Sequence, residues 1–105
     1  MKVVVLEVCR KEILKFPKPV IAEFFELISD LEEGLTLSMP VSTKMEGIGK
    51  GANELRVKDK TGIYRTIYFI KKGNAIYLVH AFKKKSQKTP KKNLDLARRR
   101  GRSVE

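Results

Sequence analysis

The sequence contains one cysteine, one histidine, no tryptophan and no long hydrophobic run. A single cysteine, Cys9, excludes an internal disulfide and a cysteine zinc cluster, and we expect its side chain to pack in the core. The apolar run at residues 3–6 ends at Glu7, so it is too short for a signal-peptide core or a membrane span. These absences favour a protein of the reducing cytoplasm that does not bind a membrane.

Acidic residues are scarce in the second half of the chain. Residues 53–105 carry 16 Lys+Arg against 4 Asp+Glu, a net of +12, whereas residues 1–52 carry 7 against 8, a net of −1. A positive field confined to one half attracts polyanions such as RNA, DNA, an anionic membrane or an acidic protein. One histidine and few carboxylates disfavour hydrolysis by a divalent metal, so we expect neither a metal nor another cofactor.

The 105 residues suffice for one compact domain, which we expect to span residues 1–105. The sequence of its first half predicts one strand and one long helix. Residues 3–8 are apolar and β-branched, which is typical of a strand. Residues 10–18 are predicted to form a polar connection. Apolar residues then recur at three- and four-residue spacing, which predicts an amphipathic helix with Pro19 in its first turn and Gly34 just past its end.

The next segment, residues 41–52, contains three glycines and is predicted to be a flexible loop. Its sequence GIGKGAN lacks the spacing of a phosphate-binding P-loop and precedes a strand, so we reject that function. A loop beside a basic sheet could still contact RNA.

The second half predicts three strands and a C-terminal helix. Residues 54–58, 63–70 and 75–84 have strand patterns and are joined by turn sequences. Thr89 is the predicted N-cap of the last helix, with Pro90 at its first position. The resulting order is β-α-β-β-β-α, which is an α+β fold with a small antiparallel four-stranded sheet, a long N-terminal helix and a C-terminal helix.

The arginines and lysines of the second half favour chemistry that depends on positive charge. Arginines remain ionised and bind phosphate through two donors, and a lysine packed among other cations can have its pKa lowered. Such groups suit metal-free RNA cleavage, in which the ribose 2′-OH attacks its own phosphate and the enzyme stabilises charge and moves two protons. The cations concerned are Arg56, Arg65, Lys83, Lys84, Lys85, Lys88, Lys91 and Lys92.

Structural interpretations stand beside these functional ones. Arg65 lies in an otherwise apolar strand and could be the ion-pair partner of Glu54 or Glu7. Arg56 could be a solvated surface residue, and the lysine cluster a nonspecific patch. His80 could be a core histidine with satisfied hydrogen bonds rather than a proton shuttle.

Aromatic residues on the same strands also have two interpretations. Tyr64, Tyr68 and Phe82 could belong to the core, or one or more of them could stack on an RNA base.

A series of short motifs runs through the second half of the chain: ELR at residues 54–56, then Tyr64-Arg65-x-x-Tyr68, then IYLVHAF-x-KK-x-QKTP at residues 76–90, followed by Ala97 and Arg99. With this series, residues 53–100 resemble the HigB-type branch of the RelE/ParE toxin superfamily, its phage-derived-protein-like group. The resemblance implies a RelE-like fold and the toxin of a type II toxin–antitoxin module. It also implies cleavage of mRNA in the ribosomal A site without metal, and an antitoxin partner that is a helix-turn-helix protein.

The resemblance also implies roles by position. Arg56 and Arg65 match the sheet arginines of the family, and Lys84 and Lys85 match the basic end of the last strand. We therefore predict these four residues to be catalytic. The residues predicted to contact nucleic acid are Lys58, Lys83, Lys88, Lys91 and Lys92.

Some relatives use C-terminal tyrosines or histidines as acid and base. This chain has no tyrosine after Tyr77 and no histidine after His80, so that scheme cannot be transferred. The lysines, with His80 as a second candidate, must supply the proton transfer instead. Two other functions remain open: a ParE-like gyrase poison, and an RNA-binding module without catalysis.

Overall fold

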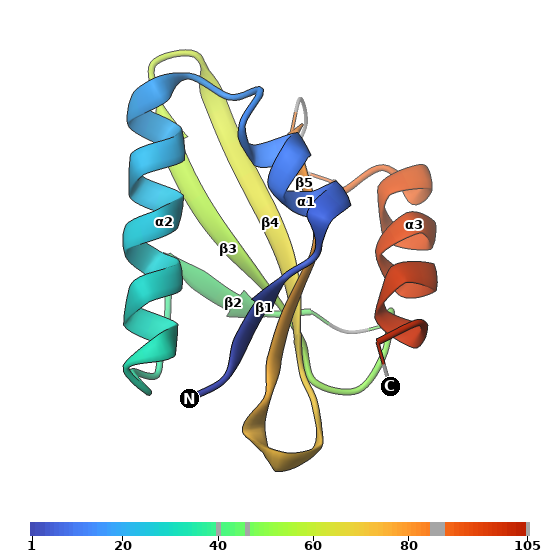
Figure 1. Cartoon of the computed structure of the whole chain (residues 1–105). Helices are drawn as coiled ribbons and strands as arrows, with labels where there is room; N and C mark the ends of the chain where they lie inside the picture. The colour runs from blue at the N-terminus through green and yellow to red at the C-terminus, as the bar shows by residue number, and fades with distance from the viewer. Residues whose placement is uncertain (40, 46, 85–87, 105) are drawn as a thin grey trace.

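The structure is a computed structural model that describes residues 1–39, 41–45, 47–84 and 88–104. A sheet lies between helices on its two faces (Figure 1). In chain order the elements are β1 (Val3–Val5), α1 (Glu7–Ile13), α2 (Lys18–Glu32), β2 (Ser42–Lys44), β3 (Ala52–Asp59), β4 (Gly62–Ile70), a 3₁₀ turn (Lys72–Asn74), β5 (Ile76–Lys84) and α3 (Lys91–Arg102).

The sheet has five strands in the order β1-β5-β4-β3-β2. The expectation of four antiparallel strands is therefore wrong in two respects. The strand β1 pairs with β5 in parallel, and two helices and three other strands between them provide the long connection that parallel pairing requires. The strand β2 lies at the opposite edge, and its sequence Ser-Thr-Lys has no alternating apolar pattern that would have predicted it.

The N-terminal segment also differs from expectation. The predicted strand at residues 3–8 ends at Val5, and α1 occupies part of the predicted polar connection at residues 10–18. Cys9 and Ile13, four residues apart on one side of α1, are completely buried. Two such positions are too few to produce a recognisable helical period.

The helix α2 matches its prediction. It begins with Lys18 and has Pro19 in its first turn, where a missing backbone N–H leaves no intrahelical bond unmade. It is capped at Glu33, and Gly34 follows with a φ of +85°, the left-handed conformation that favours glycine after a helix.

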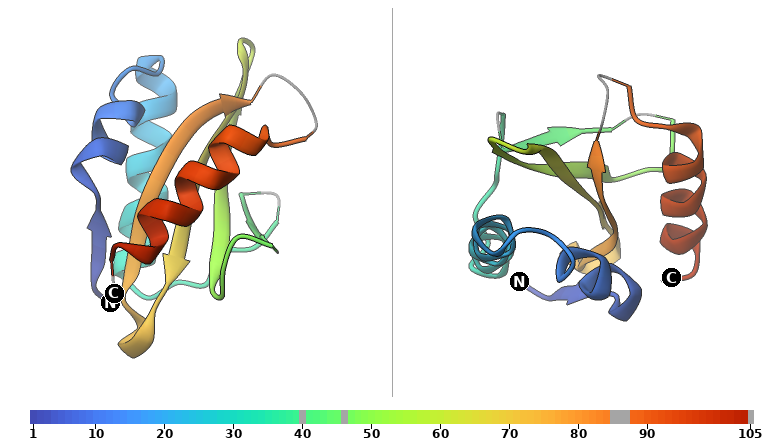
Figure 2. Two further views of the ribbon diagram at one scale, coloured as in Figure 1. Left: turned by 90° about the vertical axis from the view of Figure 1, so that its right-hand side faces the viewer. Right: turned by 90° about the horizontal axis from the view of Figure 1, so that it is seen from above.

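The two faces of the sheet support separate cores, with α2 on one side and α3 on the other (Figure 2). The strand alternation of β4 sends Tyr64 and Tyr68 toward α2, and Ile67 and Phe69 toward α3. Both tyrosines and Phe82 are at most 8% exposed, which confirms their interpretation as core residues.

The helix α3 packs closely on the sheet. Its N-cap is Pro90 rather than the predicted Thr89, because Pro90 keeps an extended backbone (φ −58°, ψ 143°) and no side chain caps the helix. Near the other end, a Cβ placed on Gly101 would lie 2.6 Å from Cε2 of Phe69, so only glycine fits there. Within the described residues, the helices are too short or too polar to cross a membrane.

Candidate functional site

Three adjacent strands bring predicted site residues to the α3 face of the sheet. Arg56 on β3 lies directly opposite Arg65 on β4. Two residues from Arg65, toward the β3–β4 hairpin, Ile63 on β4 pairs with Lys58 on β3 and with Lys84 on β5. Since side chains at alternate positions share a face, Arg56, Lys58, Arg65 and Lys84 form one cationic group, which we call the sheet cluster.

A single carboxylate organises the two arginines. Glu54 Oε1 accepts a hydrogen bond from Arg65 Nη1 and another from Arg56 Nη2, the latter at 3.3 Å. The side chains of Glu54 and Arg65 are about as buried as the core, at 4% and 5% exposed, whereas Arg56 is 31% exposed. The interpretation of Arg65 as an ion-pair partner is thus confirmed, with Glu54 and not Glu7 as its partner.

This ion pair leaves donors of both arginines unused. Within the described residues, Nε of Arg56 and Nε of Arg65 are buried and have no hydrogen-bond partner. Two guanidinium groups share one carboxylate, so the group Glu54–Arg56–Arg65 keeps a net positive charge. That net charge favours a bound anion such as a phosphate, which could reach the exposed part of the Arg56 side chain.

The surroundings of Lys84 in the sheet cluster change its pKa. Partial burial, together with the nearby charges of Arg65 and Arg56, lowers the pKa of Lys84 from its ordinary value of 10.5, although Glu54 acts in the opposite direction. The ammonium form of Lys84 is therefore easier to deprotonate than that of an ordinary lysine.

The remaining predicted lysines do not all join this group. Lys83 lies on the other face, with Nζ 5.7 Å from the ring centroid of Tyr64 in the α2 core. Lys88, Lys91 and Lys92 are exposed, just before α3 and in its first turn. Lys85, a predicted catalytic residue, lies outside the described residues.

His80 belongs to a different polar network, which connects α1, β5 and α3. Its Nδ1 donates to Glu12 Oε1 at 3.0 Å, and its Nε2 accepts from Asn93 Nδ2 at 2.8 Å. Arg100 Nη1 donates to the same Glu12 oxygen at 2.9 Å. His80 is 4% exposed, so its interpretation as a satisfied core histidine is confirmed.

Glu12 is the centre of this network, and the sequence did not reveal it. Burial by itself would raise the pKa of Glu12, but hydrogen bonds from His80, from the backbone N–H of Ala81 and from Arg100 lower that pKa below 4.5. Glu12 lies in the part of α1 that was predicted to belong to a polar connection at residues 10–18. Its partners are at least 68 residues away, so no local pattern could have identified them.

The fold is that of RelE toxins. A variant of the E. coli toxin RelE with two arginines replaced by alanine, in the free state, matches with a TM-score of 0.65 and 15% identity over 94% of this chain and 95% of that chain. A chain of the Mycobacterium tuberculosis RelBE2 toxin–antitoxin complex matches with a TM-score of 0.57 and 16% identity over 79% and 96% of the two chains. A chain of the intact E. coli RelBE toxin–antitoxin complex matches with a TM-score of 0.57 and 17% identity over 81% of this chain and 98% of that chain.

The family follows from the sequence. Residues 11–102 match the family model described as Phage derived protein Gp49-like (DUF891), and this chain belongs to that family. The resemblance to the phage-derived-protein-like group is thereby confirmed, and the expected RelE-like fold is confirmed as well. No curated protein matches the chain.

Proposed function

We propose that this protein is the toxin of a type II toxin–antitoxin pair, an endoribonuclease that cuts mRNA on the ribosome without a metal ion and so inhibits translation. The observation that carries the proposal is the sheet cluster, in which Arg56, Arg65 and Lys84 from three adjacent strands share one face. The RelE fold and the Gp49-like family support it.

In the proposed reaction the ribose 2′-oxygen forms a bond to the adjacent phosphorus, and the bond from phosphorus to the 5′-oxygen breaks. The products are a 2′,3′-cyclic phosphate and a 5′-hydroxyl. One proton leaves the 2′-OH and one is delivered to the departing 5′-oxygen, so no outside reagent is required. Catalysis then requires a fixed positive charge at the phosphate and groups that exchange protons.

The sheet cluster contains both kinds of group. Arg65 is buried and held by Glu54, so its guanidinium is already oriented before RNA binds and can stabilise charge on the phosphorane-like transition state. Arg56 is more exposed and would bind a non-bridging phosphate oxygen. Lys84, with its lowered pKa, is the proposed proton-transfer group, and Lys85, the next residue in the sequence, is proposed to add positive charge.

The proposed partners are mRNA on the ribosome and an antitoxin. Two of the similar solved structures are toxin–antitoxin complexes, which supports an antitoxin for this chain. We propose a helix-turn-helix protein in that role. A reading frame for such a protein beside this gene would agree with the proposal.

Primer extension on mRNA from translating ribosomes tests the activity. The wild-type protein should produce new 5′ ends on ribosomes kept in Mg²⁺, and treating the purified toxin alone with EDTA before the assay should not reduce them. Lys84→Ala and Arg56→Ala should reduce cleavage by about 100-fold or more. Arg99→Ala, which removes an exposed arginine of α3 outside the sheet cluster, is the matched control and should cleave normally. Circular dichroism confirms that each variant is folded.

Intact mRNA with the wild-type protein would overturn the proposed activity. Induction of the SOS response with uncut mRNA would instead indicate a gyrase poison. Salt-sensitive RNA binding without growth arrest would indicate a binding module.

A further inference from the structure

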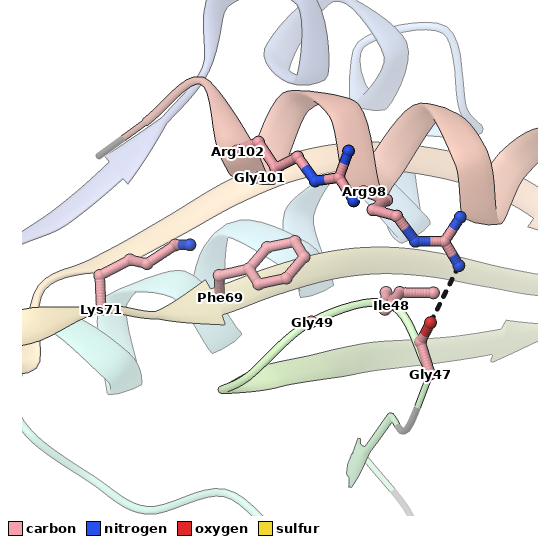
Figure 3. A pocket seen from close by; sticks show the side chains of 8 residues that line it. All are labelled: Gly47, Ile48, Gly49, Phe69, Lys71, Arg98, Gly101 and Arg102. Carbon is pink, nitrogen blue, oxygen red and sulfur yellow. Dashed lines mark hydrogen bonds between the residues drawn. The ribbon is translucent and has the colours of Figure 1, made fainter.

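A second basic site lies on the α3 face, at the opposite end of β4 from the sheet cluster. It is a pocket of about 250 Å³ between the C-terminal half of α3, the glycine loop at residues 47–51 and the end of β4 (Figure 3). Its floor includes Phe69, four residues along β4 from Arg65, which corresponds to about 13 Å. The lining residues are Gly47, Ile48, Gly49, Phe69, Lys71, Arg98, Gly101 and Arg102.

The shape of the pocket is fixed by close packing. A Cβ on Gly49 would lie 3.0 Å from the Phe69 ring, and one on Gly101 would lie 2.6 Å from it, so glycine at both positions lets the loop and the helix approach the ring. Arg98 Nη2 donates to the carbonyl oxygen of Gly47 at 2.9 Å, which joins α3 to the loop (Figure 3). These contacts hold both walls against one buried ring.

Among the described residues, the lining carries positive charge and no carboxylate. Lys71, Arg98 and Arg102 contribute three cations, and Lys71 Nζ lies 5.0 Å from the centroid of the Phe69 ring. Asp95, outside the lining, accepts a hydrogen bond from Arg98 Nη1 at 3.0 Å. The pocket is too small for a drug-sized ligand but large enough for a phosphate group with its sugar.

We propose that this pocket binds a phosphate group, and that in the RNA complex it holds a phosphate of the strand that is cut elsewhere, at the sheet cluster. The RNA part rests on the proposed function, whereas phosphate binding by the pocket does not. The 12 residues of α3 cover about 18 Å, and α3 begins just after the chain leaves the sheet cluster and ends at the pocket. A second phosphate contact would fix the position of the strand along the protein, because phosphate contacts set register.

The experiment is a titration of the isotope-labelled full-length protein, followed by amide NMR. Inorganic phosphate, a 5′-mononucleotide and a short single-stranded RNA are added separately to the wild type, to Arg102→Ala and to Arg99→Ala. Arg102 lines the pocket, whereas Arg99 is exposed on the same helix and does not, so the two variants lose the same charge.

Saturable shifts of the Gly47, Gly49 and Gly101 amides are expected with inorganic phosphate. Arg102→Ala should weaken that binding by about tenfold and reduce the slope of log affinity for RNA against log salt by about one, and Arg99→Ala should change each less. Equal effects of the two variants would overturn the proposed phosphate site, because they would show that phosphate responds only to the overall positive charge of the protein. If Arg102→Ala abolishes phosphate binding but leaves RNA affinity unchanged, the RNA part is overturned and a free anion is the ligand. Phosphate binding by a protein that leaves ribosomal mRNA intact would refute the proposed function and support the pocket.

Discussion

Arg56 and Arg65 lie directly opposite each other across the β3–β4 pair, and Glu54 binds both of them. Two like charges at opposed positions normally destabilise a sheet. Glu54 offsets that repulsion because it lies two residues before Arg56 and therefore on the same face. The same carboxylate fixes the orientation of both guanidinium groups, so the stability of the sheet and the geometry of the proposed phosphate site depend on one residue.

We predict that Glu54→Gln destabilises the protein strongly. The variant leaves Arg65 buried without a counter-ion, which costs about 3 kcal/mol or more. Urea denaturation measures the free energy of unfolding. The control is Asp95→Asn, which removes the more exposed pair with Arg98 and should change that free energy by at most about 0.5 kcal/mol. Equal stability of Glu54→Gln and the wild type would mean that Arg65 is not desolvated.

The variant Lys84→Arg tests whether Lys84 acts through its positive charge or by transferring a proton. Arginine keeps the positive charge but does not release a proton, so cleavage should fall by about 100-fold while RNA affinity changes little. The lowered pKa of Lys84 increases its neutral fraction at a given pH, so wild-type cleavage should rise with pH until that pKa is passed. Lys18→Arg, at an exposed lysine at the start of α2 on the opposite face, is the control and should retain the wild-type profile. A wild-type profile for Lys84→Arg would exclude Lys84 as the base.

Gly101→Ala tests the packing of α3 on Phe69. Alanine is ordinarily the better helix former by up to about 1 kcal/mol. Here its methyl group would overlap the buried ring, and overpacking of that kind costs about 1–3 kcal/mol, so we expect a net loss of stability. The thermal midpoint measures it, with the exposed Arg99→Ala on the same helix as the control. A gain in stability would contradict the close approach of α3 to the sheet.

The Glu12 network predicts a fall in stability at acid pH. The pKa of Glu12 is lowered in the folded protein, so its contribution is present above the ordinary value of 4.5 and is lost as the pH falls through the folded pKa. Unfolding free energy measured from about pH 7 to about pH 3 should therefore drop less steeply in Glu12→Gln than in the wild type. Glu23→Gln, on an exposed part of α2, should keep the wild-type slope. Parallel curves for all three proteins would show that Glu12 does not contribute.

The sequence predicted the parts of the fold that depend on local chemistry. The turn between Asp59 and Gly62 and the alternation along β3 and β4 were predicted, because two-residue hairpins and period-two patterns are encoded within a few residues. That alternation also placed Arg56 and Lys58 together. Glu54 was one of two candidate partners for Arg65, and three-dimensional register was required to choose it.

The missed features depend on contacts between distant segments. The parallel pairing of β1 and the helix α1 are both stabilised against β5, more than 60 residues away, and neither carries a long enough pattern of its own. The pocket was missed for the same reason. The glycine loop was predicted to be flexible, but the contact of Arg98 with Gly47 is visible only once α3 has been placed on the sheet.

The parallel pairing of β1 with β5 has a consequence for folding. Val3 pairs with Ile76, so the first strand to leave the ribosome cannot find its partner until most of the chain has been synthesised. The β3–β4–β5 meander is formed by contacts of short sequence separation and can form first, with β1 and α1 docking last. We therefore expect a fast refolding phase that creates the sheet cluster and a slower one, sensitive to Val4→Ala, that closes the N-terminal edge.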